Sequence, residues 1–278
     1  MGFRITLCNE VIRTLPFAAQ CDFAAACGYD GMELAPFTVS DEPDRIDAAQ
    51  IQQMRRAAAD AGICITGLHW LLVKPDGLSL ASTDPAVRAR SRDLMRRLVE
   101  LCAELGGGYL VHGSPAQRAL PPGVPASRGW VEGAFLAAGE AAARAGVTYI
   151  IEPLAPALTN CFVSVAEAAE FVRRAGLPAL RTMLDTSAAA QGEQEPPEAV
   201  LARWLPTGLI AHVHLNDANQ RGPGQGDQLF APVLRTLRDH RNTGWIGVEP
   251  FQYVPDGPAC AARAVGYLRG LQESLAAG

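Results

Sequence analysis

Short apolar segments alternate with helix-forming segments eight times along the 278-residue sequence, and this alternation constrains the fold more than any other feature. Strands are predicted at residues 3–9, 31–34, 63–69, 109–112, 148–152, 181–185, 210–214 and 245–249. Strands and helices that alternate in this way indicate an α/β fold, a (β/α)8 TIM barrel. The competing fold, a doubly wound open sheet, usually has a glycine-rich turn after its first strand, and residues 8–13 contain no glycine.

The composition fits one domain that spans residues 1–278, because 49% of the residues are hydrophobic and 19% are charged. The net charge of −5 and the lack of a basic block argue against nucleic acid as a partner. No apolar run reaches the length of a membrane span, so no membrane partner is expected. The seven cysteines form no Cys-x-x-Cys pair and no signal peptide is evident, which favours a cytoplasmic protein with reduced cysteines.

A polar residue ends each predicted strand. These residues are Asn9, Glu33, His69, His112, Glu152, Asp185, His214 and Glu249. Alternation along a strand puts His212 and His214 on one face, and it likewise puts Gly247 and Glu249 on one face of the last strand. The carboxyl ends of parallel barrel strands meet on one rim, where this fold carries its active sites. We therefore expect these polar side chains to converge.

The last four strands supply three carboxylates and one imidazole, from Glu152, Asp185, His214 and Glu249. Alone, each residue has an ordinary explanation as a helix cap, an ion-pair partner or a hydrogen-bonded core group. Together, on successive strands, they favour a site for one divalent metal ion with positions left open for a substrate. This oxygen-rich set suits Mn²⁺, Mg²⁺ or Co²⁺ best, and Zn²⁺ is also compatible.

Motifs around these strand ends follow one another along the whole chain. They are Gly28-Tyr-Asp-Gly-Met-Glu33, Ile151-Glu-Pro-Leu154, Leu184-Asp-Thr186, His212-Val-His-Leu-Asn-Asp217, Pro223-Gly-Gln-Gly-Asp227 and Gly247-Val-Glu-Pro-Phe251. The pattern resembles the xylose isomerase-like barrel superfamily, which includes ketose 3-epimerases, hydroxypyruvate isomerases, inosose dehydratases and endonuclease IV. The resemblance implies that the four residues named above bind one divalent metal, and it implies a homo-oligomer, a dimer or a tetramer.

Three positions depart from the pattern of the ketose 3-epimerases. Leu158 stands where those enzymes have a second glutamate, six residues after the strand-five glutamate. Ala188 stands where they have a substrate-binding histidine, and Arg221 is displaced by one position from the usual arginine. The metal set is therefore intact while part of the sugar-binding set is missing. We expect a substrate other than a plain ketohexose, or one that is held differently.

His69 and His112 end the third and fourth strands, as histidines of endonuclease IV do. Two further ligands of the endonuclease zinc cluster have no counterpart here, because Ala188 replaces one and residues 221–227 contain no Asp-x-His pair. We interpret His69 and His112 as hydrogen-bond partners of the substrate. A second metal site and ordinary packing at the rim remain open alternatives.

Other rim residues are candidates for contacts with the substrate. Glu33 ends the second strand on the same rim, and Trp70, with Phe37 and Phe251, is expected to form an apolar wall. Lys74, Arg118 and Arg221 lie on predicted rim loops and are candidates for binding a phosphate or a carboxylate. Loop packing and solvated charge are the alternatives. The proline-rich segment 113–127 is long for a barrel turn, which favours a functional lid.

These observations predict a metal-dependent isomerase or epimerase of a small sugar, polyol-derived ketone or hydroxy-keto compound. Glu152 and Glu249 are the predicted catalytic residues, which move a proton through an enediolate. A dehydratase of the inosose type at the same site is the main alternative. A zinc phosphodiesterase like endonuclease IV and an inactive sugar-binding barrel are further alternatives.

Overall fold

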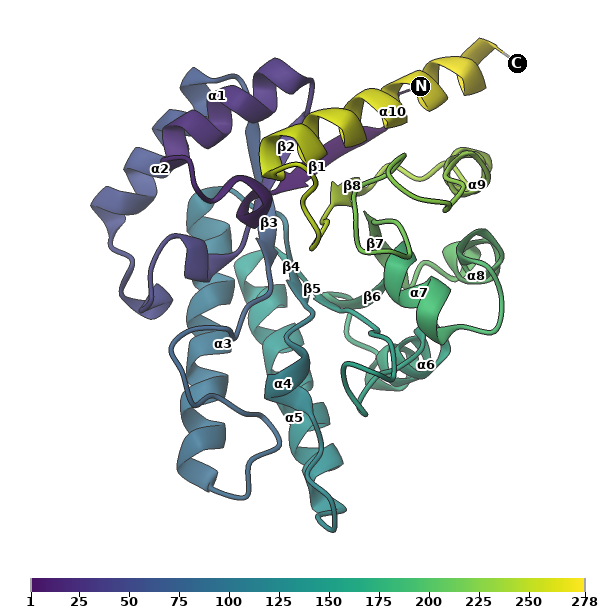
Figure 1. Cartoon of the computed structure of the whole chain (residues 1–278). Coiled ribbons are helices and arrows are strands. Elements are labelled where there is room, and N and C mark those ends of the chain that lie inside the picture. The colour runs from purple at the N-terminus through teal and green to yellow at the C-terminus, as the bar shows by residue number, and fades with distance from the viewer. Residues whose placement is uncertain (1, 278) are drawn as a thin grey trace.

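Parallel strands pair in chain order and close into a barrel in the computed structural model, which describes residues 2–277 (Figure 1). The strands are β1 Arg4–Cys8, β2 Gly31–Leu34, β3 Cys64–His69, β4 Tyr109–His112, β5 Thr148–Ile151, β6 Leu180–Asp185, β7 Ile210–Leu215 and β8 Trp245–Val248. The ring closes where β1 pairs with β8, with Thr6 beside Gly247. The predicted (β/α)8 barrel is confirmed.

Long helices surround the strands, and short helices lie in the segments that connect the strands and the long helices (Figure 1). The α-helices are α1 Phe17–Cys27, α2 Ala48–Asp60, α3 Pro85–Leu105, α4 Pro115–Arg118, α5 Ala126–Ala145, α6 Val165–Ala175, α7 Thr186–Gly192, α8 Pro197–Trp204, α9 Ala231–Asp239 and α10 Gly257–Ala277. The 3-10 helices are η1 Asn9–Ile12, η2 Pro36–Thr38, η3 Pro43–Arg45 and η4 Leu205–Thr207. None of the helices in the described part of the chain is both long and apolar enough to span a bilayer.

Local sequence signals explain several helix boundaries. The Asp84 side chain accepts a hydrogen bond from the Ala86 amide at 2.8 Å and caps α3, which begins at Pro85, a residue that suits the first position of a helix. The Asp185 carboxylate likewise accepts a hydrogen bond from the Ala188 amide and caps α7, which the sequence did not predict. A seven-residue helix is too short to show a hydrophobic period, so this omission has a simple cause.

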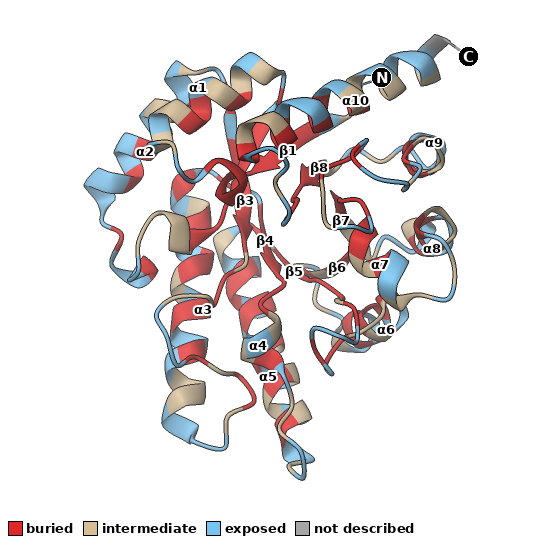
Figure 2. Ribbon diagram, in the orientation of Figure 1, coloured by how far each residue is buried: buried red, intermediate tan, exposed pale blue. Residues whose placement is uncertain are grey.

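Apolar side chains fill the layer between the strands and the helices, and Figure 2 shows buried strands beneath helices whose outer faces are exposed. The barrel interior is more polar. Thr6 and Thr66 share a hydrogen bond of 3.0 Å there. Gly247 lies against His212 and His214, and a Cβ at this position would lie 2.5 Å from the His214 ring. The glycine therefore leaves room for two imidazoles in one layer of the barrel.

Candidate metal centre

Glu152, Asp185, His214 and Glu249 converge at the carboxyl ends of β5 to β8, as the sequence predicted. The residues each offer a ligand atom, and these atoms all lie within 4.8 Å of one another. The four side chains are buried. Strand register explains the convergence, because Asp185 pairs with His214, and His214 pairs with Gly247, two residues before Glu249. We call these four residues the rim cluster.

The imidazole of His214 lies in the middle of the rim cluster. Its Nδ1 atom is 2.8 Å from Glu249 Oε2 and 3.7 Å from Glu152 Oε1. Its Nε2 atom faces the barrel interior, 3.1 Å from Glu33 Oε1. A carboxylate that holds the far nitrogen of a histidine fixes the ring orientation and the tautomer of a metal ligand. Nδ1 has no well-directed hydrogen bond and so is free to act as a ligand.

Asn216 links two members of the rim cluster, and the sequence analysis did not identify it. Its side-chain amide donates to Asp185 Oδ2 at 2.6 Å, and its carbonyl oxygen accepts from the Glu249 amide at 3.0 Å. The asparagine is fully buried. It follows the His-x-His motif by two residues, so its position in that motif was the available signal. Asn216 thus orients one carboxylate and the backbone of another.

The three carboxylates of the rim cluster repel one another unless a cation is present. Burial, together with Glu152 and Glu249, raises the pKa of Asp185 to about 8. Burial also raises the pKa of Glu249 to about 7, although His214 opposes this shift. Burial disfavours the imidazolium, but Glu249 and Glu33 raise the pKa of His214 well above its ordinary value. A divalent cation would relieve this repulsion, so the donor set fits a bound metal ion.

Glu33 lies beneath the rim cluster rather than along the cavity. It is fully buried and accepts a hydrogen bond from the Tyr109 hydroxyl at 2.6 Å. Its carboxylate is also 3.1 Å from His212 Nε2. Burial opposes ionisation, but His214 and His212 hold the pKa of Glu33 well below its ordinary range. The structure therefore gives Glu33 contacts with His214, whereas the sequence placed it with the substrate-binding residues.

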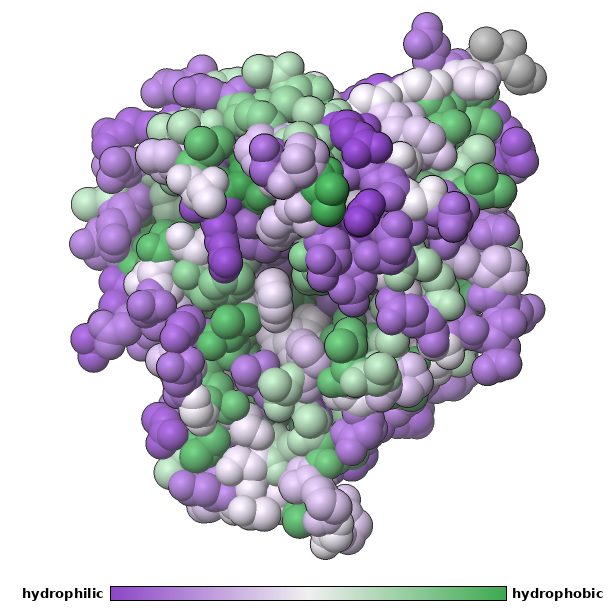
Figure 3. All heavy atoms as spheres, in the orientation of Figure 1, coloured by the Kyte–Doolittle hydropathy of each residue, from purple (hydrophilic) through white to green (hydrophobic). Residues whose placement is uncertain are grey.

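A cavity of about 270 Å³ opens above the rim cluster. Its floor includes Glu152, Asp185 and Glu249, and an apolar wall includes Trp70 and Phe251. The two aromatic rings pack edge to face at 5.7 Å, and Phe37 packs against Trp70 in the same way at 5.3 Å. Figure 3 shows a hollow near the middle of this face, with hydrophobic and weakly polar side chains on most sides of it and hydrophilic ones along its upper edge. Trp70 and Phe251 therefore form the apolar wall, whereas Phe37 packs against Trp70 without lining the cavity.

Both predicted substrate-binding histidines are fully buried and point to protein partners. His69 Nε2 lies 2.8 Å from Glu10 Oε2. His112 Nδ1 lies 2.7 Å from the Tyr149 hydroxyl, and burial lowers the pKa of His112 well below its ordinary value. Neither imidazole is among the side chains that line the cavity. The two rings therefore lie behind the cavity wall, and a direct contact with substrate stays a prediction.

The three basic rim residues do not line the cavity either. Lys74 pairs with the exposed Asp76 at 3.0 Å, and Arg221 is half-buried in the loop after β7. Arg118 was a rim-loop candidate for binding a phosphate or a carboxylate, but it is the last residue of α4 and its side chain is fully buried. Its guanidinium donates to the Glu152 carbonyl at 2.6 Å and to the His112 carbonyl at 3.2 Å. Arg118 thus supports the backbone behind Glu152.

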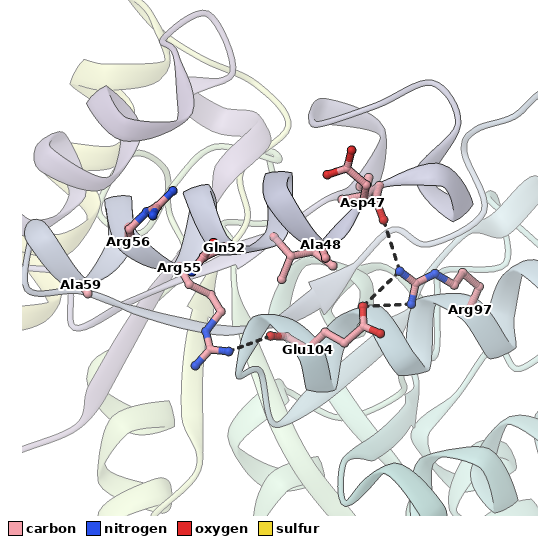
Figure 4. Close-up of a pocket in the computed structure, with 10 residues that line it drawn as sticks. Asp47, Ala48, Gln52, Arg55, Arg56, Ala59, Arg97 and Glu104 are labelled. Atoms are coloured by element: carbon pink, nitrogen blue, oxygen red, sulfur yellow. Dashed lines mark hydrogen bonds and ion pairs between the residues drawn. The ribbon is translucent and has the colours of Figure 1, made fainter.

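A larger hollow, of about 860 Å³, lies on the outside of the barrel between α2 and α3 (Figure 4). Two of the three arginines that line it, Arg97 and Arg55, have partners. Arg97 pairs with Glu104 at 3.0 Å, and Arg55 donates to the Glu104 carbonyl at 3.4 Å. The residues around this hollow do not converge on a common point as the rim cluster does. The smaller cavity above the rim cluster is therefore the candidate functional site.

Comparison with known proteins places these features in context. A family model described as the xylose isomerase-like TIM barrel matches residues 21–271. The chain is 28% identical over 242 residues to D-psicose 3-epimerase of Agrobacterium fabrum, covering 84% of this chain and 79% of that protein. It is 25% identical over 209 residues to L-ribulose 3-epimerase of Mesorhizobium japonicum, covering 74% of this chain and 67% of that protein.

Solved structures share the fold at lower identity. A crystal structure of D-psicose 3-epimerase in the presence of D-fructose superposes with a TM-score of 0.81 at 20% identity, covering 97% of this chain and 99% of that chain. The apo form of 3-keto-D-glucoside 4-epimerase from E. coli also has a TM-score of 0.81 at 20% identity, covering 97% and 100%.

Proposed function

Because the chain belongs to the xylose isomerase-like TIM barrel family, we propose that it is a metal-dependent epimerase or isomerase of a small ketose or hydroxy-keto compound. The observation that carries this proposal is the rim cluster, which forms the floor of a small cavity. The two curated relatives described above are named as ketose 3-epimerases, which supports the same reaction class.

In this proposal Glu152, Asp185, His214 and Glu249 hold one divalent cation. Three carboxylates and one imidazole suit Mn²⁺, Mg²⁺ or Co²⁺, which accept oxygen-rich ligand sets. A bound cation of this kind polarises a carbonyl group and acidifies the adjacent C–H bond. The chain itself supplies orientation, through Glu33 at the far nitrogen of His214 and Asn216 at Asp185.

Glu152 and Glu249 are the proposed proton-transfer groups. Both carboxylates line the cavity, and they come from strands that are separated by β6 and β7. They therefore approach a bound substrate from different sides. One carboxylate removes the carbon-bound proton to give an enediolate, and either one returns a proton to that carbon. Return from the opposite side inverts the carbon, as in an epimerase, and return from the same side suits an isomerase.

The cavity favours a small substrate without a charged group. Its volume of about 270 Å³ is below the roughly 300–1,000 Å³ of sites for larger ligands. Among the described residues that line it, none is lysine or arginine, so a phosphate ester would lack a cationic partner. The neutral polar side chains of Ser187, Gln191 and Gln220 line the cavity and are available for sugar hydroxyls. A neutral monosaccharide matches these properties.

Dehydration at the same site is the second candidate. Leu158 and Ala188 both line the cavity, at the positions where the ketose 3-epimerases have a glutamate and a histidine. Elimination begins with the same proton removal and ends with loss of a neighbouring hydroxyl group. A phosphodiesterase has less support, for two reasons. His69 and His112 do not belong to the same group of potential metal ligands, and no lysine or arginine side chain lines the described cavity.

Product analysis tests the proposal. The protein, stripped of metal and reloaded with Mn²⁺, is incubated in D₂O with a panel of neutral ketoses and their phosphate esters. We expect a product of unchanged composition, inverted or isomerised at carbons next to the carbonyl and labelled there with deuterium. A product that has lost water would favour the dehydratase. Absence of both exchange and product with every ketose would overturn the proposal.

A further inference from the structure

A second group of metal-ligand side chains adjoins the rim cluster. Cys8 ends β1, Glu10 lies in η1, His69 ends β3, and Glu249 follows β8. Their ligand atoms lie within 4.8 Å of one another, and all four side chains are buried. His112 is not part of this group. The group therefore differs from the second metal site that the sequence suggested, which paired His69 with His112.

Glu249 belongs to both groups, and its two oxygen atoms face different histidines. Oε2 is 2.8 Å from His214 Nδ1, on the side of the rim cluster. Oε1 is 3.6 Å from His69 Nε2, on the side of Cys8 and Glu10. A carboxylate with one oxygen toward each of two donor groups has the geometry of a bridge between two metal ions.

An unpaired carboxylate oxygen among several buried carboxylates also indicates a cation here. Glu10 Oε1 is buried and has no hydrogen-bond partner within the described residues, while Oε2 contacts His69. Buried carboxylates are costly unless they are paired or bound to metal. The interior holds five buried carboxylates in contact with these groups, namely Glu10, Glu33, Glu152, Asp185 and Glu249. A cation bound by this group would satisfy the unpaired oxygen of Glu10.

We propose that Cys8, Glu10, His69 and Glu249 bind a second divalent ion, of the class that accepts thiolate, imidazole and carboxylate together, with Zn²⁺ as the natural choice. Four protein ligands leave no open position, as in structural zinc sites. On binding, the Cys8 thiol loses its proton to solvent and its sulfur forms the metal bond. The second ion would fix the Glu249 carboxylate beside the rim cluster and lower its basicity, so that Glu152 would carry most of the proton transfer while this ion is bound. The proposal does not depend on the proposed reaction.

Titration of the metal-free full-length protein with Co²⁺, under a reductant that does not bind metal, tests this inference. A thiolate ligand gives Co²⁺ an intense near-ultraviolet charge-transfer band, whereas oxygen and nitrogen ligands give only weak visible bands. We expect two equivalents of bound Co²⁺, one of them with the thiolate band. A single equivalent, or two equivalents without the band, would overturn the second site.

Variants assign the signals. Cys8→Ala should remove the band and one equivalent, and Cys21→Ala, which alters another fully buried cysteine in α1, should keep both. Glu10→Gln should weaken the second site at least about tenfold, since even residues that only support ligands cost this much. Cys8 also lies near Glu33 and His214, so the thiolate band alone does not show which ion Cys8 binds. Asp185→Ala separates the two sites. It should lose the ion of the rim cluster and keep the band; loss of both signals would show one shared ion and refute the proposal.

Discussion

Lowering the pH should release the metal ion from the rim cluster, because protons compete for the same oxygen atoms. The pKa of metal-free Asp185 is about 8 and that of Glu249 is about 7. Both groups must ionise before they bind a cation, so affinity rises with pH and levels off above the higher pKa. His214, whose pKa is also raised, changes the affinity in the same direction.

The size of the effect follows from the two carboxylates. Each pH unit below a pKa weakens binding about tenfold, or 1.36 kcal/mol. At about pH 6 the two groups together weaken Mn²⁺ binding on the order of 10³-fold relative to about pH 8.5. The same protons are released when metal binds, so calorimetry in two buffers of different ionisation enthalpy counts them. Free Mn²⁺, measured by electron paramagnetic resonance, gives the affinity.

Two variants identify the titrating groups. Glu249→Gln removes one titrating group and also one of the negative neighbours that raise the pKa of Asp185. The loss of Mn²⁺ affinity on acidification should therefore be smaller by about tenfold or more. Asp93→Asn, an exposed aspartate of α3, should keep the full pH dependence. A wild-type affinity that changes less than tenfold over this range, or tightens toward acid, would refute the electrostatic picture of the rim cluster.

Further expectations concern binding, turnover and stability. Asp185→Ala and His214→Ala should abolish tight Mn²⁺ binding in calorimetry while circular dichroism stays native, because both residues lie at the rim rather than in the apolar core. Glu152→Gln should retain Mn²⁺ and lose about 10²–10⁴-fold in turnover of the substrate found by the ketose panel. Metal-free protein should resist urea better at pH 5 than at pH 8, because folded Asp185 keeps a proton that the unfolded chain has lost. Phe135→Ala, which truncates a fully buried side chain of α5, should cost about 3–5 kcal/mol in urea unfolding.

The sequence was sufficient for the barrel and for the rim cluster. Both depend on strand alternation and on the meeting of parallel strand ends, which a periodic pattern encodes directly. His214 and Glu249 could be placed on the inward faces of β7 and β8 for this reason. The loops were harder to predict. Arg118 was predicted on a rim loop, either bound to a ligand or solvated, but it is buried because the segment around α4 folds back over the backbone of Glu152.

The contacts that cross the barrel could not be predicted from local patterns. Cys8 was expected only to be one of the reduced cysteines, and Glu10 follows β1 in a 3-10 turn that shows no hydrophobic period. The proximity of these two residues to His69 and Glu249 exists only because the ring closes between β8 and β1. Asn216 was visible in a motif, but its bonds to Asp185 and to the Glu249 amide required the structure.

The central claim is that the rim cluster, with one divalent ion, moves a carbon-bound proton of a neutral ketose. The most direct measurement follows deuterium entering the substrate by nuclear magnetic resonance, in protein that is stripped of metal and then reloaded with Mn²⁺. We predict exchange at one carbon next to the carbonyl, lost on chelation, restored by Mn²⁺ and suppressed in Glu152→Gln. Exchange that persists in stripped protein, or at an unchanged rate in the fully loaded variant, would contradict the claim.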